Sequence, residues 1–176
     1  AIDFYVPPIG LKISDLAIAR NIEPAKLEKG LGLKSMALMD VDEDAASMAA
    51  NALHKLIVNN NIDPKNLGRI YLGTESALDA AKPTATYAVG MVEEKLAKQH
   101  GLRCFKNCDV VDMTFACVGA VDALENCIDW IKSNSERKAI VIASDVAKYE
   151  LASTGEYTQG AGAVAMLISS NPSIIS

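Results

Sequence analysis

The sequence predicts a layered α/β fold built on one mixed, largely buried sheet. Strand-like and helix-like segments alternate along its 176 residues, which is typical of helices packed on a sheet. Two short apolar runs, 139–144 and 163–168, have the composition of strands that are buried on both faces. With 50% hydrophobic and 22% charged residues, the chain can form one substantial core, so we expect a single domain over residues 1–176.

The first half of the chain predicts a strand, two helices and a second strand. In order, these segments are 2–6, 13–20, 46–57 and 69–73. The longer helix has apolar residues at helical spacing. It follows a capping signal, Asp40-x-x-Glu43, and it is stopped by Asp63-Pro64.

The second half predicts a helix, a strand, another helix and two strands. In order, these segments are 84–98, 104–111, 116–131, 139–144 and 163–168. Both helices place apolar residues on one face, as helices that pack on a sheet do. Because such folds present functional side chains at the carboxyl ends of strands, the residues after each strand are the first candidates for chemistry.

Cys117 lies where an apolar segment turns into the helix 116–131. The free N–H groups at a helix N-terminus favour a thiolate, which is a nucleophile, and the backbone N–H of Cys117 could stabilise an oxyanion. Its small neighbours Ala116, Gly119 and Ala120 would let a substrate carbonyl approach the backbone. The alternative is that Cys117 is a small buried hydrophobic residue, as many free cysteines are.

Glu75 follows the strand 69–73 directly and is a candidate proton shuttle if it is partly desolvated there. The alternative is a carboxylate at a helix N-terminus or an exposed loop charge. Gly155-Glu-Tyr-Thr-Gln-Gly-Ala-Gly-Ala163 is a glycine-rich turn before a strand, and it lacks the Lys-Ser/Thr ending of a P-loop. We therefore expect close packing beside a ligand here, with Thr158 offering a hydroxyl.

Metal, nucleic-acid and membrane functions are disfavoured by composition. The four cysteines have spacings that match no common zinc site, and we expect His54 and His100 to be structural or solvated. A net charge of −5 argues against broad binding to nucleic acid or to an anionic membrane. No apolar run is long enough to span a bilayer and no secretory leader begins the sequence, so we expect a cytosolic protein.

Three segments in this order resemble the hydroxymethylglutaryl-CoA synthases of the thiolase superfamily. They are the stretch from Gly73 to Lys82, the Phe-Ala-Cys element ending at Cys117, and the stretch from Gly155 to Met166. The opening residues 2–7 and the stretch 30–36 also resemble that family, so the resemblance spans nearly the whole chain. It implies a thiolase-like half-fold, the N-terminal half of a pseudo-symmetric enzyme about twice as long, which pairs as a homodimer through this half.

The resemblance also implies a reaction in the mevalonate pathway that needs no cofactor, with coenzyme A thioesters as substrates. Cys117 would accept the acetyl group of acetyl-CoA, and Glu75 would be the acid and base in condensation with acetoacetyl-CoA. Thr158 matches a position that contacts product, and Glu23, Pro24 and Lys26 match the region near the coenzyme A nucleotide. The histidine that orients acetoacetyl-CoA would belong to the C-terminal half, which is absent here.

Two other functions remain open. One is a synthase-like enzyme that acts on ketones tethered to a carrier protein. The other is a dimerisation module that keeps the thiolase half-fold without turnover, although neither Cys117 nor Glu75 is needed for packing.

Overall fold

A five-stranded mixed sheet forms the centre of the protein, whose structure is a computed structural model that describes residues 1–175. The strands lie in the order β1 (Ile2–Tyr5), β7 (Gly160–Ser169), β6 (Lys138–Ala147), β4 (Arg69–Gly73) and β5 (Asp109–Met113). β7 is antiparallel to both of its neighbours, whereas β6, β4 and β5 are parallel. The predicted mixed α/β fold is confirmed.

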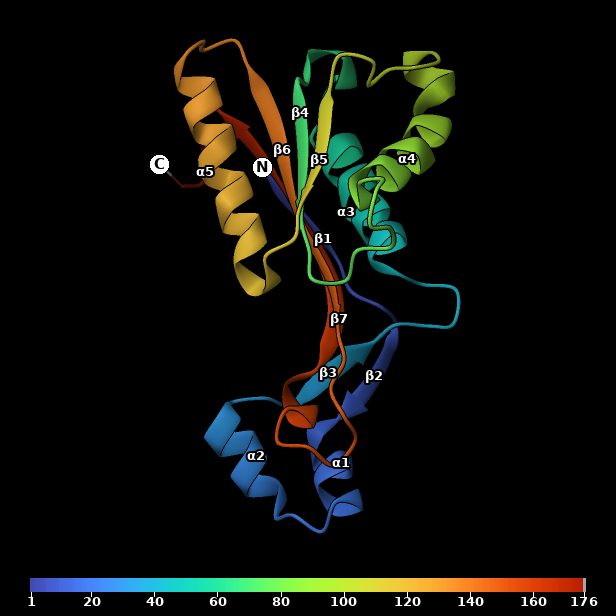
Figure 1. Cartoon of the computed structure of the whole chain (residues 1–176), viewed down its shortest axis with the longest axis vertical. Helices are drawn as coiled ribbons and strands as arrows, with labels where there is room; N and C mark the ends of the chain where they lie inside the picture. Colours follow the sequence, from blue (N-terminus) through green and yellow to red (C-terminus); the bar gives the residue numbers. More distant parts are fainter. Residues whose placement is uncertain (176) are drawn as a thin grey trace.

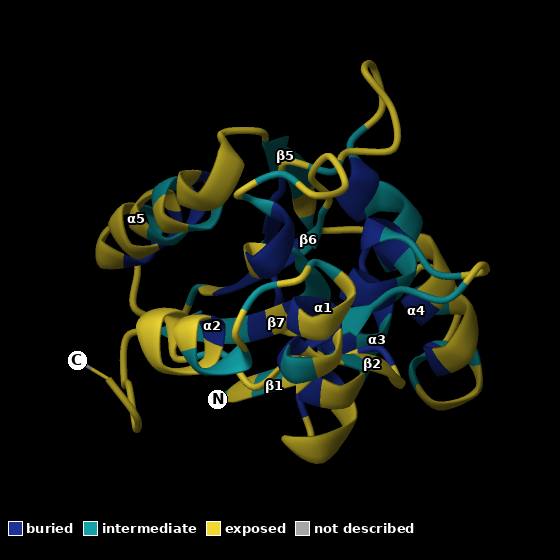
Figure 2. Cartoon of the chain, turned by 90° about the horizontal axis from the view of Figure 1, so that it is seen from below, coloured by how far each residue is buried: buried dark blue, intermediate teal, exposed yellow. Residues whose placement is uncertain are grey.

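Helices cover both faces of this sheet. α3 (Ala45–Asn59) and α4 (Thr84–His100) pack on one face, and α5 (Gly119–Lys132) packs on the other (Figure 1). Viewed from below, the buried residues follow the sheet and the inner sides of the helices, while the outer sides of α4 and α5 are exposed (Figure 2). Burial of these apolar residues is the main force that holds the layers together.

A smaller unit lies at one end of the sheet (Figure 1). It contains a hairpin of β2 (Ile9–Lys12) and β3 (Ser35–Leu38), together with α1 (Ile13–Ala19) and α2 (Pro24–Leu31). Its apolar core also includes Tyr157, from the short 3₁₀ turn η3 (Glu156–Thr158) that precedes β7. We predicted α1 but missed α2, β2 and β3, because they have only four to eight residues each and too little periodicity to be recognised.

The predicted cap of α3 is wrong. The N-cap is Asp44, whose carboxylate accepts a hydrogen bond from the Ser47 backbone N–H at 2.7 Å, while the Ser47 hydroxyl accepts one from the Asp44 N–H at 2.8 Å. Glu43 instead accepts a hydrogen bond from the Asp40 N–H in the preceding turn. Ser47 completes this capping box in place of the glutamate that the motif usually contains.

Several other boundaries differ from the prediction. β6 and β7 extend beyond the predicted 139–144 and 163–168, and α5 begins at Gly119 rather than at residue 116. α3 ends at Asn59, and Asp63 caps the separate turn η1 (Pro64–Asn66) rather than stopping the helix. The strand expected over 104–111 begins only at Asp109, so Cys104 and Cys108 lie before it rather than in it. Cys104 is buried and Cys108 is partly buried against the main core, so apolar residues in this segment pack inward without forming a strand.

Candidate active site

Cys117 lies in the 3₁₀ turn η2 (Ala116–Val118), which leads from β5 into α5. Its position just before the N-terminus of α5 confirms the predicted location, and its exposure contradicts the alternative of a buried hydrophobic cysteine. Ala116, directly before it, has a φ of +38°, which is strained for a residue with a Cβ. Strain of this kind is often found at functional sites.

Glu75 lies at the same edge of the sheet. It follows β4, whose end is joined to the end of β5 by a hydrogen bond of 3.2 Å from the Thr74 N–H to the Met113 carbonyl. The adjacent carboxyl ends of these parallel strands therefore lead into the loop with Glu75 and into the segment with the Cys117 turn at the same edge of the sheet. Glu75 is exposed in the loop after β4, as the alternative interpretation expected, and in this structure its side chain is not partly buried.

Two glycines bring these segments together. A Cβ on Gly73 would overlap the backbone of Ala120, and a Cβ on Gly119 would overlap the Met113 carbonyl. Glycine is therefore required at both positions for α5 to start against the ends of β4 and β5. The small size of Gly119 is required for this packing, and its expected role in letting a substrate approach stays a prediction.

Asp145, on β6, fixes the backbone at Glu75. Its carboxylate accepts hydrogen bonds from the Glu75 N–H at 2.6 Å and from the hydroxyl of the buried Thr74 at 2.9 Å. The Ser76 hydroxyl also binds the backbone of Val146. The backbone at Glu75, the candidate acid/base residue, is thus fixed by hydrogen bonds to β6.

A second aspartate, Asp112, binds the start of α4 at the same edge of the sheet. Asp112, on β5, accepts hydrogen bonds from the backbone N–H groups of Thr84 at 2.5 Å and Ala85 at 2.9 Å, the first two residues of α4. The Thr84 hydroxyl in turn accepts a hydrogen bond from the Leu78 N–H. A carboxylate at this helix start satisfies free N–H groups and so fixes α4 to the site.

The other predicted site residues lie in the smaller unit and in the turn attached to it. Thr158 is exposed in η3, where its hydroxyl donates to the Gly155 carbonyl at 2.9 Å. Glu23 is the exposed N-cap of α2, Pro24 is its first residue, and Lys26 is exposed on its first turn. These four residues lie on other elements than the ends of β4 and β5 that lead to Glu75 and the Cys117 turn.

The remaining cysteines differ from Cys117 in their surroundings. Burial raises the pKa of Cys108 to about 12 and that of Cys127 to about 11, and it also raises the pKa of Cys104. A thiol whose pKa is raised is a poor nucleophile at neutral pH. His54 lies on α3 and His100 ends α4, on the face of the sheet opposite α5.

Comparison with known proteins identifies the family. The sequence profile described as "Hydroxymethylglutaryl-coenzyme A synthase N terminal" matches residues 1–173. The chain belongs to the hydroxymethylglutaryl-CoA synthase family. It is 41% identical over 161 residues to the synthase of Haloferax volcanii, covering 90% of this chain and 35% of that protein. It is 35% identical over 174 residues to the synthase of Enterococcus faecalis, covering 99% of this chain and 42% of that protein.

Solved structures of hydroxymethylglutaryl-CoA synthases have the same fold. A structure of MvaS in complex with 3-hydroxy-3-methylglutaryl coenzyme A has a TM-score of 0.87 and 37% identity, over 96% of this chain and 38% of that one. A synthase complexed with coenzyme A has a TM-score of 0.82 and 31% identity, over 97% and 41%. The expected thiolase-like half-fold is confirmed, and the chain spans about two-fifths of the length of these relatives.

The part of the chain that the structure describes has neither a metal-binding cluster nor a membrane-spanning helix. Residues 1–175 contain no group of three or more His, Cys, Asp or Glu side chains placed to hold a metal ion. The helices among these residues are all too short or too polar to cross a bilayer.

Sequence reasoning missed three residues that organise the site. Asp145 and Asp112 lie at the carboxyl ends of strands, so the rule that singled out Glu75 could have found them. Arg20 binds Glu156, which is 136 residues away in the sequence, and no local pattern indicates that pairing.

Proposed function

We propose that the chain supplies the acyl-accepting part of a hydroxymethylglutaryl-CoA synthase in the mevalonate pathway. Cys117 attacks the thioester carbonyl of acetyl-CoA, coenzyme A leaves as its thiol, and an acetyl-cysteine thioester remains. The observation that carries this proposal is that Glu75 and the exposed Cys117 follow the adjacent, hydrogen-bonded carboxyl ends of β4 and β5.

Glu75 carries the proton traffic of the next steps. It removes a proton from the methyl group of the acetyl thioester, and the resulting carbanion equivalent adds to the ketone of acetoacetyl-CoA. Glu75 then returns the proton to the new alkoxide, and water hydrolyses the cysteine thioester to release the product. No cofactor is required, because both substrates are coenzyme A thioesters. Thr158, Glu23, Pro24 and Lys26 provide contacts with them.

Condensation requires the remainder of a full-length synthase, including the histidine that orients acetoacetyl-CoA. Exposed apolar residues on the side of the sheet that α5 packs against support an interface with that C-terminal part. Phe4, which is 59% exposed, lies opposite Val164, which is 37% exposed, on this face, and Val121 of α5 is 53% exposed. Uncovered apolar side chains gathered on one face are typical of a surface that packs against another.

Two further properties belong to this proposal. β5 is an edge strand of the sheet, so its unpaired edge beside the Cys117 turn suits homodimer formation through this half. Light scattering after size-exclusion chromatography measures the oligomeric state.

A cytosolic location suits a nucleophile that must stay reduced, and all four cysteines are free.

The test is to incubate the chain with isotopically labelled acetyl-CoA and to map the label on peptides. We expect one acetyl adduct on Cys117 that is absent from Cys117→Ala, with Cys127→Ala as the matched control. Absence of an adduct from the chain, both alone and when it is supplemented with the C-terminal part of the Enterococcus faecalis synthase, would contradict the proposal. It would favour the non-catalytic dimerisation module.

A second candidate donor is an acetyl group carried by a protein. The chain resembles a structure of the curacin biosynthetic pathway HMG synthase in complex with acetyl donor-ACP, with a TM-score of 0.82 and 28% identity, over 96% of this chain and 40% of that one. Parallel acetylation with acetyl-CoA and with an acetyl carrier protein decides between the donors. Faster acetylation by the carrier protein at equal concentration would favour this second candidate.

A further inference from the structure

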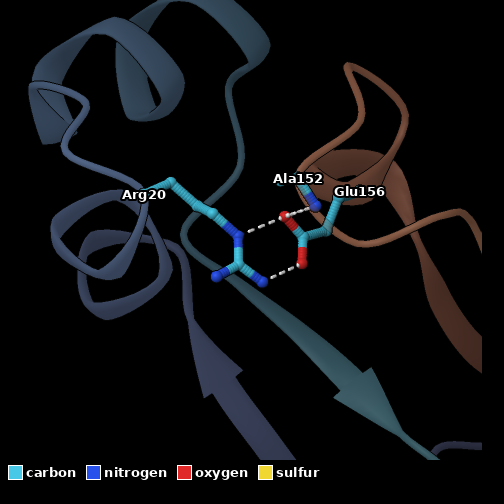
Figure 3. Close-up of polar contacts among 3 residues, drawn as sticks. All are labelled: Arg20, Ala152 and Glu156. Carbon is cyan, nitrogen blue, oxygen red and sulfur yellow. Dashed lines mark hydrogen bonds and ion pairs between the residues drawn. The ribbon is translucent and has the colours of Figure 1, made fainter.

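Arg20 and Glu156 form an ion pair that fastens the turn carrying Thr158 to α1. The Arg20 Nε and Nη2 groups donate to the two carboxylate oxygens of Glu156 at 2.8 and 2.6 Å, and the Ala152 N–H donates to one of them at 3.0 Å (Figure 3). The Glu156 side chain is only 1% exposed, whereas that of Arg20 is 28% exposed. Both carboxylate oxygens are thus satisfied by a geometry that only a planar guanidinium provides.

The neighbours of both residues belong to the candidate ligand site. Tyr157, next to Glu156, packs in the core of the smaller unit with Leu16 and Leu27, and Thr158 follows it. Arg20 is the C-cap of α1 and stands three residues before Glu23, the N-cap of α2. The pair therefore joins the two segments on which we place contacts with the coenzyme A thioester.

Stability alone does not explain a buried charge at this place. A buried ion pair is weak support for stability, because desolvation of both charges offsets their attraction, and apolar residues of similar size often do as well. Tyr157 already provides an apolar anchor for the same turn. What the fork-shaped contact adds is a fixed orientation between α1 and the turn.

We propose that Arg20 and Glu156 are a positioning pair. The pair fixes the position of the Thr158 turn relative to the Glu23–Lys26 segment, so that the ligand contacts on both segments are in place before the thioester binds. This inference rests on the proposed function. It predicts that loss of the pair weakens binding of acetyl-CoA without changing the chemistry at Cys117.

The experiment measures the rate of Cys117 acetylation as a function of acetyl-CoA concentration in Arg20→Met, Arg20→Lys and Glu156→Gln. We expect the half-saturating concentration to rise roughly tenfold in Arg20→Met, since small misplacements of binding groups are costly, and less in Arg20→Lys. The maximal rate and the rate of Cys117 alkylation by iodoacetamide should stay within about twofold of the parent. Lys132→Met, which breaks an exposed ion pair with Asp129 on α5, is the matched control and should change neither quantity.

Amide hydrogen exchange gives a second readout that does not depend on acetylation. In Arg20→Met we expect faster exchange at Ala152 and in residues 153–159, with the core of α3 unchanged. An unchanged half-saturating concentration in a folded variant overturns the inference, as does faster exchange throughout the chain, which would make the pair merely structural. If the parent chain is not acetylated at all, the proposed function fails, and unchanged exchange at residues 152–159 then overturns the positioning role separately.

Discussion

The carboxylate of Asp145 accepts a hydrogen bond of 2.6 Å from the backbone N–H of Glu75, across the boundary between β6 and the end of β4. The same oxygen accepts the hydroxyl of Thr74, which is completely buried. One side chain thereby fixes the main chain on which the candidate acid/base residue stands.

Replacement of Asp145 should destabilise this edge of the sheet. In Asp145→Ala the Thr74 hydroxyl and the Glu75 N–H lose their acceptor, so we expect the free energy of unfolding to fall by about 1–3 kcal/mol. Asp145→Asn keeps one acceptor oxygen and should lose less. Urea denaturation of both variants measures the difference, and equal losses would show that the acceptor oxygen is not what matters.

Substitution at the two close-packed glycines should be disruptive. Gly73→Ala and Gly119→Ala place a Cβ into backbone atoms, so we expect each to lower the free energy of unfolding by at least about 2 kcal/mol. Gly90→Ala is the matched control, because Gly90 is exposed within α4 and has no atom near its added Cβ. There the change should stabilise by about 0.5–1 kcal/mol, and thermal denaturation compares the three.

The four cysteines should react in a fixed order. At pH 8 we expect iodoacetamide to modify the exposed Cys117 first, because burial raises the pKa of Cys104, Cys108 and Cys127 and keeps them as thiols. Peptide mapping after partial alkylation shows the order. Early modification of Cys127 in the folded chain would contradict the packing of α5 on the sheet.

Loss of Glu75 should separate the two half-reactions. In a complete synthase assembled from this chain and the C-terminal part of the Enterococcus faecalis relative, Glu75→Ala should leave acetylation of Cys117 largely intact. Condensation should slow by about 10²–10⁴-fold, the usual contribution of a general acid or base. Loss of acetylation in a correctly folded variant would refute this division of roles.

Acid should weaken the attachment of the Thr158 turn. The two hydrogen bonds from the Arg20 guanidinium lower the pKa of Glu156 below its value in the unfolded chain, which is about 4.3. The folded state then binds fewer protons, so this contribution to stability is complete above about pH 5 and is lost as the pH falls through the folded pKa. Urea denaturation between pH 6 and pH 3 should show a smaller acid-dependent loss in Glu156→Gln than in the parent chain.

The elements with a clear apolar pattern could be predicted from the sequence. The strand 69–73 was predicted with the bounds that the structure gives, and the helix that follows it differs only at its last residues. Short elements were not predictable: β2 and β3 have four residues each, and their pairing supplies a stability that no local pattern reveals.

The candidate site was predictable where local rules apply and not where distant segments meet. Cys117 precedes a helix and Glu75 follows a strand, and both positions hold in the structure. The strain at Ala116 is invisible in the sequence, because alanine is compatible with an ordinary helix start. The Arg20–Glu156 pair depends on the folded chain, which brings α1 beside the turn before β7.

The glycine contact between β4 and α5 has a practical meaning for protein engineering. Because Gly73 and Gly119 meet backbone to backbone, the placement of the segments that carry Glu75 and Cys117 is independent of side-chain rotamers. A designer could therefore exchange the surrounding side chains to admit a bulkier acyl group and leave this spacing intact. The two glycines are the positions that such a redesign has to keep.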